Sequence, residues 1–244
     1  MNKNRRTFIK NMALAGGCAY FSLSPTRLLG EEGEKRIAPM ERVDDNSLNY
    51  KQTIIILKKA YMREIQAHLA YTKFSLKALE EGYSNIAYLF KSFAVAESIH
   101  GRNFRNSLVS LREQPISPAE KFEVLSTKEN LGQAISLELK EIDIYYPEHI
   151  RTIKAEEHWN SITAVSHALA SEKQHEHLLQ KMKKGTGIFW SMLKQKIEGE
   201  DVAFFICQVC GSTLTEIPDI CPICGKPNSF YKEIEKAKCK AKKF

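Results

Sequence analysis

The sequence has little of the alternation of apolar and polar residues that predicts β-strands. No stretch of useful length alternates in this way between residues 47 and 198, so a sheet is not expected there. The apolar run near the N-terminus, Met12 to Leu23, is too short to span a bilayer as an ordinary helix. Since 43% of the 244 residues are hydrophobic, the chain can still bury a core. These features predict a globular protein that is mainly α-helical.

The body of the chain also lacks a strong excess of charge of one sign. The formal net charge is +7, but residues 1–30 carry five basic residues and no acid, and residues 232–244 carry six lysines and two glutamates. The basic residues are therefore concentrated at the two ends, and the remainder is close to neutral. Because nucleic-acid binding requires a basic surface, nucleic acid is not an expected partner.

Two adjacent arginines, Arg5 and Arg6, are followed by Phe8 and Lys10 and then by the modest apolar run. This order resembles a twin-arginine export signal, which a receptor reads in bacteria. We therefore expect residues 1–30 to be an export signal and residues 31–46 to be a polar linker. The resemblance implies a periplasmic or otherwise exported protein. The alternatives are an uncleaved signal that anchors the chain in a membrane, and a cytoplasmic protein with a basic N-terminal segment.

Four long segments repeat apolar residues at helical spacing. They are expected at about 47–81, at 84–111, from residue 127 onward, and from residue 160 or 161 to about 184. Gly82 should stop the first helix and Ser84 should cap the second, while Pro147 should kink or end the third. A further helical piece is expected at 188–197. Four amphipathic helices predict a four-helix bundle.

A Glu-x-x-His pattern occurs twice, at Glu97 and His100 and again at Glu172 and His175. Residues three apart lie on the same face of a helix, so each pair directs a carboxylate and an imidazole to one point. Both pairs lie in apolar stripes. An ionised carboxylate buried there costs on the order of several kcal/mol unless a proton, a cationic partner or a metal neutralises it.

The other two helices also present a glutamate on the apolar face, Glu64 on the first and Glu138 on the third. One glutamate from each of two helices and Glu-x-x-His from the other two is the arrangement of the ferritin-like di-iron carboxylate proteins. Carboxylates and imidazoles suit iron and manganese. The pattern therefore predicts a ferritin-like bundle over residues 47–198 with a dinuclear metal site inside it.

Six cysteines are present, and four of them form two C-x-x-C pairs, Cys207 with Cys210 and Cys221 with Cys224. This spacing indicates a metal site before it indicates disulfides. Four thiolates gathered into a tetrahedron bind zinc or iron, and the pairs by themselves leave both metals open. A small four-cysteine domain is expected at residues 199–236, followed by a basic tail at 237–244.

A ferritin-like bundle followed by a four-cysteine domain resembles rubrerythrin, whose C-terminal domain is rubredoxin-like, over about residues 50–235. The resemblance implies a further carboxylate ligand on the third helix, Glu141, which exchanges with His100 as a ligand to one iron when the redox state changes. One departure is Ser212, which stands where the family often has an aromatic residue.

The same resemblance implies that Tyr71 and Tyr146 form hydrogen bonds just outside the ligand set. His68 lies one turn from Glu64 and could join them. The remaining histidines are expected to be structural or exposed.

The resemblance implies a non-haem di-iron peroxidase that reduces hydrogen peroxide to water and protects against oxidative stress. Two irons would lie in the bundle, and an iron held by the four cysteines would return electrons, with structural zinc as the alternative metal. It also implies a homodimer or higher homo-oligomer, in which electrons cross between subunits, and an external electron donor that the sequence does not identify. The alternatives are a ferroxidase or iron-binding protein, and an electron-transfer protein whose bundle is a scaffold.

Overall fold

The structure is a computed structural model that describes residues 49–116, 122–183 and 201–236. Its helices are α1 (Lys51–Glu80), α2 (Ser84–Ser110), α3 (Thr127–Lys140), α4 (Tyr146–Lys154) and α5 (Trp159–Lys183), with a π-helix, η2 (Glu141–Tyr145), between α3 and α4. Three short strands follow, β1 (Phe205–Cys207), β2 (Thr213–Leu214) and β3 (Tyr231–Glu233), and a 3-10 helix, η3 (Asn228–Phe230), precedes β3. The expected export signal, linker, helix at 188–197 and basic tail lie outside the described residues.

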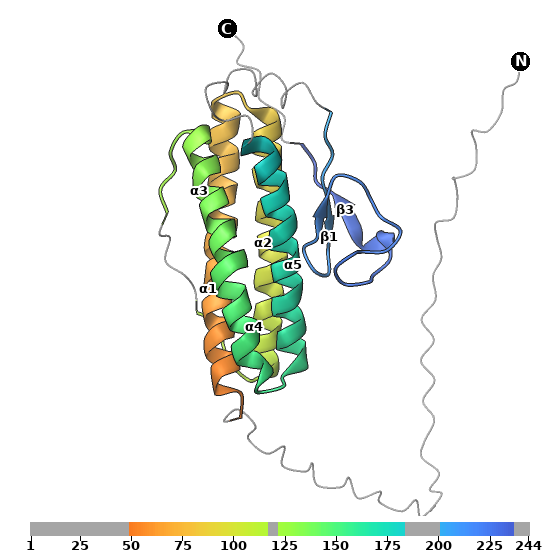
Figure 1. Cartoon of the computed structure of the whole chain (residues 1–244). Coiled ribbons are helices and arrows are strands. Elements are labelled where there is room, and N and C mark those ends of the chain that lie inside the picture. Colours follow the sequence, from red (N-terminus) through yellow and green to blue (C-terminus); the bar gives the residue numbers. More distant parts are fainter. Residues whose placement is uncertain (1–48, 117–121, 184–200, 237–244) are drawn as a thin grey trace, which may run out of the picture. The chain divides into compact units, whose positions relative to one another are not determined.

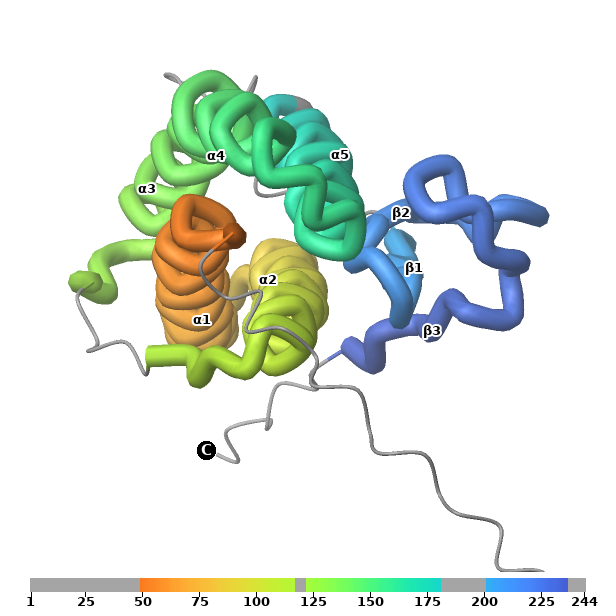
Figure 2. The backbone as a smooth tube through the Cα atoms, turned by 90° about the horizontal axis from the view of Figure 1, so that it is seen from below, coloured from red at the N-terminus to blue at the C-terminus, as the bar shows by residue number. Residues whose placement is uncertain are grey.

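The helices α1, α2, α3 and α5 lie side by side (Figure 1). The most extensive packing joins α1 to α2, and further contacts join α3 to α5, α2 to α5 and α1 to α3. The end-on view in Figure 2 shows these helices around a common interior. The periodicity predicts a mainly α-helical fold with a four-helix bundle, and both predictions are therefore confirmed. None of the described helices combines the length and apolar character needed to cross a membrane.

Gly82 ends α1 as predicted. Its φ of +80° is one that residues with a side chain rarely adopt, and it lets the N–H of Tyr83 donate to the carbonyl of Ala78 at 2.8 Å. The second helix starts at Ser84, but Ser84 is its first helical residue and not its cap. The residue with non-helical backbone angles is Tyr83, with φ −105° and ψ 77°, and its side chain makes no capping hydrogen bond.

The prediction that Pro147 kinks or ends the third helical segment was wrong in its place. The α-helical pattern changes earlier, at Glu141, where the π-helix begins, and the chain then continues as α4 with Pro147 in its first turn. Tyr145 and Tyr146 keep helical backbone angles, so the chain remains helical through Pro147 and the helical segment does not end there. A π-turn holds more residues than an α-turn, so it changes the faces on which Glu141 and Tyr146 lie relative to α3.

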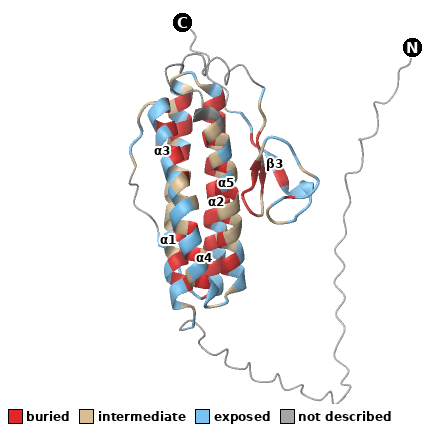
Figure 3. Ribbon diagram, viewed as in Figure 1, coloured by how far each residue is buried: buried red, intermediate tan, exposed pale blue. Residues whose placement is uncertain are grey.

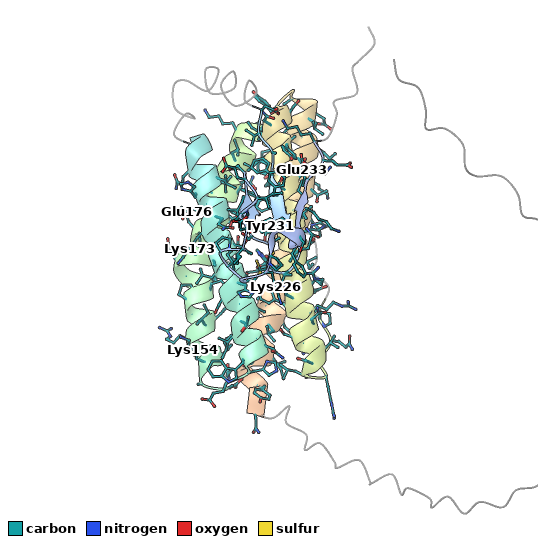
Figure 4. All side chains as sticks on the ribbon, turned by 90° about the vertical axis from the view of Figure 1, so that its right-hand side faces the viewer. Lys154, Lys173, Glu176, Lys226, Tyr231 and Glu233 are labelled. Atoms are coloured by element: carbon teal, nitrogen blue, oxygen red, sulfur yellow. The ribbon has the colours of Figure 1, made fainter. Side chains whose placement is uncertain are left out.

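The C-terminal domain contains a three-stranded antiparallel sheet with the strand order β2-β1-β3. Phe205 of β1 lies opposite Leu214 of β2 and Glu233 of β3, which sets the register. The strands β1 and β2 contact α2 and α5. Figure 4 looks onto this sheet, with Tyr231 and Glu233 labelled on β3. The small domain therefore packs on two of the bundle helices.

The bundle helices bury one face each, and Figure 3 shows buried residues on the inward faces and exposed residues outside. One core cluster contains packed aromatic rings, among them Tyr71, Phe74 and Phe90, whose ring centres lie 5.5–6.2 Å apart. A second cluster contains Leu57 and Phe104. Glu64 on α1 and His100 on α2 lie between the two clusters along their helices.

Leu57→Ala should lower the free energy of unfolding by about 2–5 kcal/mol, because truncation leaves a cavity where Leu57 is now fully buried on α1. Denaturant unfolding followed by circular dichroism measures this change. Leu76→Ala is the matched control, since Leu76 lies on the same helix but is 57% exposed. It should change the free energy of unfolding by no more than about 0.5 kcal/mol, and equal losses in the two variants would contradict the assigned packing.

Candidate metal centres

The bundle helices place the predicted ligands together in the interior, and the residues of both groups below are buried. Two groups of potential metal ligands result: Glu64, Glu97, His100 and Glu172 form the first, and Glu97, Glu138, Glu172 and His175 form the second. In each group the four candidate ligand atoms lie within 4.8 Å of one another. Glu97 and Glu172 belong to both groups, so these two carboxylates are placed to bridge two ions.

The first group is arranged around Nδ1 of His100. This atom lies 2.9 Å from a carboxylate oxygen of Glu97, 3.1 Å from one of Glu172 and 3.4 Å from one of Glu64. Because these carboxylates come from three different helices, the centre depends on the packing of α1, α2 and α5.

The second group is arranged in the same way around Nδ1 of His175. Its distances to carboxylate oxygens are 3.0 Å for Glu172, 3.2 Å for Glu97 and 3.9 Å for Glu138. Lys173 and Glu176, the neighbours of this group on α5, point outward (Figure 4). The local helix thus separates the inward-facing ligands from a solvated face, as a three-residue spacing requires.

Burial affects the outer carboxyls of the two groups most strongly. Burial, together with the nearby Glu97, raises the pKa of Glu64 well above its ordinary value. Burial, together with Glu172, does the same to the pKa of Glu138. Without a cation near them, both carboxyls therefore favour the protonated form.

The shared carboxyl of Glu172 and the ring of His175 behave in the opposite way. Burial opposes the ionisation of Glu172, but the rings of His175 and His100 outweigh it and hold its pKa well below the ordinary value. Burial disfavours the imidazolium form of His175, yet Glu97 and Glu172 raise its pKa to about 9. The buried charge is therefore balanced by protons on the histidines, and metal ions would replace those protons.

Oε2 of Glu138 is buried and makes no hydrogen bond. Oε1 of Glu97 and Oε1 of Glu172 are also buried, and each lies near a shared imidazole Nδ1, at 3.2 Å and 3.1 Å, without a well-formed hydrogen bond. A buried acceptor without a partner is costly, and a coordinated cation removes that cost. Carboxylate oxygens and imidazole nitrogens are also suitable ligands for iron. The residues present therefore fit a pair of iron ions.

Both predicted tyrosines contact the ligands. The hydroxyl of Tyr71 donates to Oε1 of Glu138 at 2.5 Å, and that of Tyr146 donates to Oε1 of Glu64. Both tyrosines are buried. Each hydroxyl occupies one oxygen of its carboxylate and so helps to set the direction of the other.

Glu141 lies outside both ligand groups. Its Oε2 is 3.8 Å from Nη1 of Arg63 on α1, and the guanidinium carbon of Arg63 lies 3.3 Å from the ring centre of Tyr145. Burial raises the pKa of Glu141 to about 8, although Arg63 acts to lower it. The structure thus pairs Glu141 with a cation and does not gather it with the ligands, where the family resemblance implies that it binds.

A pocket of about 450 Å³ reaches the cluster from the side of α1 and α3. Glu141 and Arg63 contribute to its lining, together with carboxylates of both ligand groups. A small substrate therefore has a route to the cluster.

His68 does not join the site. Its Nδ1 donates to the carbonyl oxygen of Ala94 on α2 at 2.7 Å, so the ring links two helices instead of contacting the carboxylates. His68 lies four residues after Glu64 and so on the same side of α1, but its hydrogen bond to the Ala94 carbonyl occupies Nδ1.

The four cysteines of the C-x-x-C pairs converge in the C-terminal domain. Sγ of Cys207 lies 3.7 Å from that of Cys224, and Sγ of Cys210 lies 3.6 Å from that of Cys221. A tetrahedron of sulfurs at about 2.3 Å from a metal has edges of about 3.8 Å, so these separations fit one tetrahedral ion. Hydrogen bonds from the Cys210 thiol and from the backbone N–H groups of Cys210 and Val209 lower the pKa of Cys207 to about 5, against the effect of burial.

Hydrogen bonds attach this domain to both bundle helices that it contacts. On α2, Arg102 donates to the carbonyl of Gln208 at 2.6 Å, and Asn103 donates to that of Val209 at 2.8 Å. On α5, Ser171 donates to the carbonyl of Gly211 at 2.9 Å. The first C-x-x-C turn, or knuckle, therefore lies directly on the part of the bundle that carries the histidines.

Gly211 makes a very close approach to a ligand. A Cβ built on it would overlap Nε2 of His100, and its φ is +83°. The corresponding edge of the second imidazole, Nε2 of His175, lies 3.1 Å from Oγ1 of Thr213. Both histidines thus point Nδ1 at the carboxylates and Nε2 at the four-cysteine domain.

Sequence reasoning missed three contributors: Arg63, Gly211 as a contact of His100, and Thr213. Arg63 had a signal, because it is a basic residue directly before a predicted buried ligand, Glu64. Thr213 had none, since it is 38 positions from its partner.

The bundle and the four-cysteine domain each match a known protein family. The family model described as Rubrerythrin matches residues 56–183, and the one described as Rubrerythrin, rubredoxin-like domain matches residues 205–232. Rubrerythrin-2 of Clostridium acetobutylicum is 32% identical over 184 residues, covering 73% of this chain and 95% of that protein. Nigerythrin of Nitratidesulfovibrio vulgaris is 27% identical over 202 residues, covering 81% and 94%. A solved structure of fully reduced, all-ferrous nigerythrin has a TM-score of 0.64 at 26% identity and covers 75% of this chain and 86% of that one.

Metal uptake by the bundle should weaken as the pH falls below about 9. His175, whose pKa is raised to about 9, holds a proton below that pH, and a metal ion that binds Nδ1 must displace it. Each displaced proton changes the affinity about tenfold per pH unit. Titration with Co²⁺ between about pH 7 and 8.5, after the four-cysteine site has been filled, measures this slope. An affinity that does not change over the range would contradict the raised pKa of His175 or its role as a metal ligand.

Gly211→Ala should disturb the bundle metal site, because the added methyl group collides with His100. Gly225→Ala is the matched control, since Gly225 occupies the same place in the second knuckle with φ +69° but has nothing within 4 Å of its would-be Cβ. The control should lose only about 1–2 kcal/mol from the left-handed backbone. Co²⁺ absorption of the bundle site should change in the first variant alone, and identical spectra would contradict the close approach.

Proposed function

This chain belongs to the rubrerythrin family, and from that premise we propose that it is a peroxidase that reduces hydrogen peroxide to water. As a member, it has a di-iron carboxylate site in the bundle and a four-cysteine rubredoxin-like site after it. Two ferrous ions held by these ligands would supply the two electrons that, with two protons, convert one hydrogen peroxide to two water molecules. The remaining tasks belong to the protein: to hold the ions, to admit the substrate and to renew the electrons.

The ligand set supports a site that tolerates a change in charge. Glu97 and Glu172 reach both positions, so one pair of carboxylates can balance either ion. Tyr71 and Tyr146 hold the outer carboxylates Glu138 and Glu64 by hydrogen bonds, which limits their movement when the charge changes.

The pocket supports a small polar substrate. Carboxylates of both ligand groups contribute to its lining, together with Arg63 and Glu141, whose Nη1 and Oε2 atoms lie 3.8 Å apart. A peroxide molecule is about the size of two waters, each of which occupies about 30 Å³ in the liquid, so the 450 Å³ of the pocket accommodates it.

The contact between the four-cysteine domain and both histidines is the observation that carries the proposal. Gly211 directly follows Cys210 in the first knuckle and lies against His100, and Thr213 contacts His175. The iron of the four-cysteine site would carry one electron at a time, and the di-iron site would use two in each turnover. A peroxidase needs such a nearby electron donor, because its di-iron site must be reduced again after each turnover. It has no evident use in an iron store.

Further parts of the proposal concern the setting of the reaction. We propose that an external donor reduces the iron of the four-cysteine site, that the protein protects against oxidative stress, and that it forms a homodimer or higher homo-oligomer. Export through the twin-arginine-like segment at residues 1–30 is likewise proposed, and that segment lies outside the described residues.

Rapid mixing of the anaerobically reduced protein with hydrogen peroxide and, separately, with dioxygen tests the proposal. We expect three irons per chain. Both centres should be oxidised faster by peroxide than by dioxygen, because peroxide is the proposed substrate. Faster oxidation by dioxygen would favour the ferroxidase alternative instead. Zinc in the four-cysteine site would remove the internal electron path.

Cys207→Ser separates the two centres within this experiment. It should leave the bundle site loaded and able to react once with peroxide, but slow steady-state turnover at least about tenfold, because one of the four thiolates that hold the electron-returning iron is lost. Cys239→Ser is the control, since Cys239 belongs to neither C-x-x-C pair, and it should turn over normally. Unchanged turnover of Cys207→Ser would contradict the relay.

A further inference from the structure

Thr213 connects the four-cysteine domain to one metal ligand by a set of buried hydrogen bonds. Its Oγ1 lies 3.0 Å from the carbonyl oxygen of Gly211 and 3.1 Å from Nε2 of His175. Its backbone N–H donates to Oε1 of Gln174 at 2.9 Å. Thr213 is 1% exposed and His175 is fully buried, so water does not compete for these bonds.

The direction of these bonds follows from the atoms involved. A carbonyl oxygen can only accept, so the single proton of the Thr213 hydroxyl is donated to Gly211. Towards His175 the hydroxyl oxygen is then an acceptor, and Nε2 must carry the proton. The neutral ring consequently has its lone pair on Nδ1, which is the atom that faces Glu97 and Glu172.

The turn that carries Thr213 is itself fixed from α5. Ser171 donates to the same Gly211 carbonyl at 2.9 Å, and Gln174 accepts from the backbone of Thr213. These residues are neighbours of His175 on one helix, so the hydroxyl has little freedom to move away from the imidazole. A fixed acceptor of this kind orients a metal-binding histidine and increases its basicity.

The other histidine is held differently. Nε2 of His100 is buried without a hydrogen bond and faces Gly211, which has no side chain to offer. The hydroxyl of Thr213 therefore acts on one of the two ligand groups, the one that contains Glu138 and His175.

We propose that Thr213 is a positioning residue of the bundle metal site: its hydroxyl holds His175 with the proton on Nε2 and Nδ1 directed at the second metal position. The C-terminal domain is then a structural part of the di-metal site as well as a carrier of the metal held by the four cysteines. The proposal rests on the family's di-iron site and is independent of peroxidase activity.

Thr213→Val tests the proposal in the full-length chain, since valine keeps the shape and removes the hydroxyl. The four-cysteine site is filled first, and the bundle is then titrated with Co²⁺. The ion held by the group that contains His175 should bind about 10–100-fold more weakly, and the ion held by the group that contains His100 should change little. Thr213→Ser retains the hydroxyl and should restore most of the affinity. Thr215→Val is the control for the substitution itself, because Thr215 is exposed in the same domain, and it should bind both ions normally.

A spectroscopic comparison of the unaltered chain with Thr213→Val gives a second readout. In the Zn²⁺-loaded protein, ¹⁵N NMR should find His175 coordinated through Nδ1, with a slowly exchanging proton on Nε2, and Thr213→Val should shift the Nε2 signal and speed its exchange. Coordination through Nε2, or equal affinity for the second ion in Thr213→Val and the unaltered chain, would overturn the proposal. Because both readouts avoid turnover, a protein without peroxidase activity could still satisfy them, and the two proposals fail separately.

Discussion

The structure depends on the burial of several carboxylates in an apolar bundle. Glu64, Glu97, Glu138 and Glu172 come from four helices and are all nearly inaccessible to solvent. Such groups are stable together only when cations or protons compensate them. The two histidines provide that compensation in the protein alone, and two iron ions would provide it more completely. The packing of the bundle and the chemistry of the site are therefore one constraint.

The four-cysteine domain covers the side of the two buried histidines that faces away from the carboxylates. The carboxylates use Nδ1 of each histidine, so the Nε2 edges must find another environment. A glycine without a side chain accommodates one edge, and a threonine hydroxyl accepts from the other. The domain thus completes the surroundings of the ligands while it brings the four-cysteine site close to them.

Features within one helix or one knuckle could be predicted from the sequence. The two Glu-x-x-His pairs repeat at an offset that a helix converts into a shared face, and the positive φ values of Gly82 and Gly211 are ones for which glycine is suited. Predictions failed where helical geometry itself changes. The π-helix before Pro147 has no clear signature in the periodicity, because it alters the residue count of a single turn.

The sequence by itself determined that four helices carry inward-facing ligands and that four cysteines form a compact metal site, since both depend on spacings of a few residues. Only the tertiary structure decided which atoms meet across the chain. The ion pair of Arg63 with Glu141 and the hydrogen bond of Thr213 with His175 join residues that lie far apart in the sequence. Such contacts arise from the packing of whole helices and domains, and a local pattern of residues does not encode them.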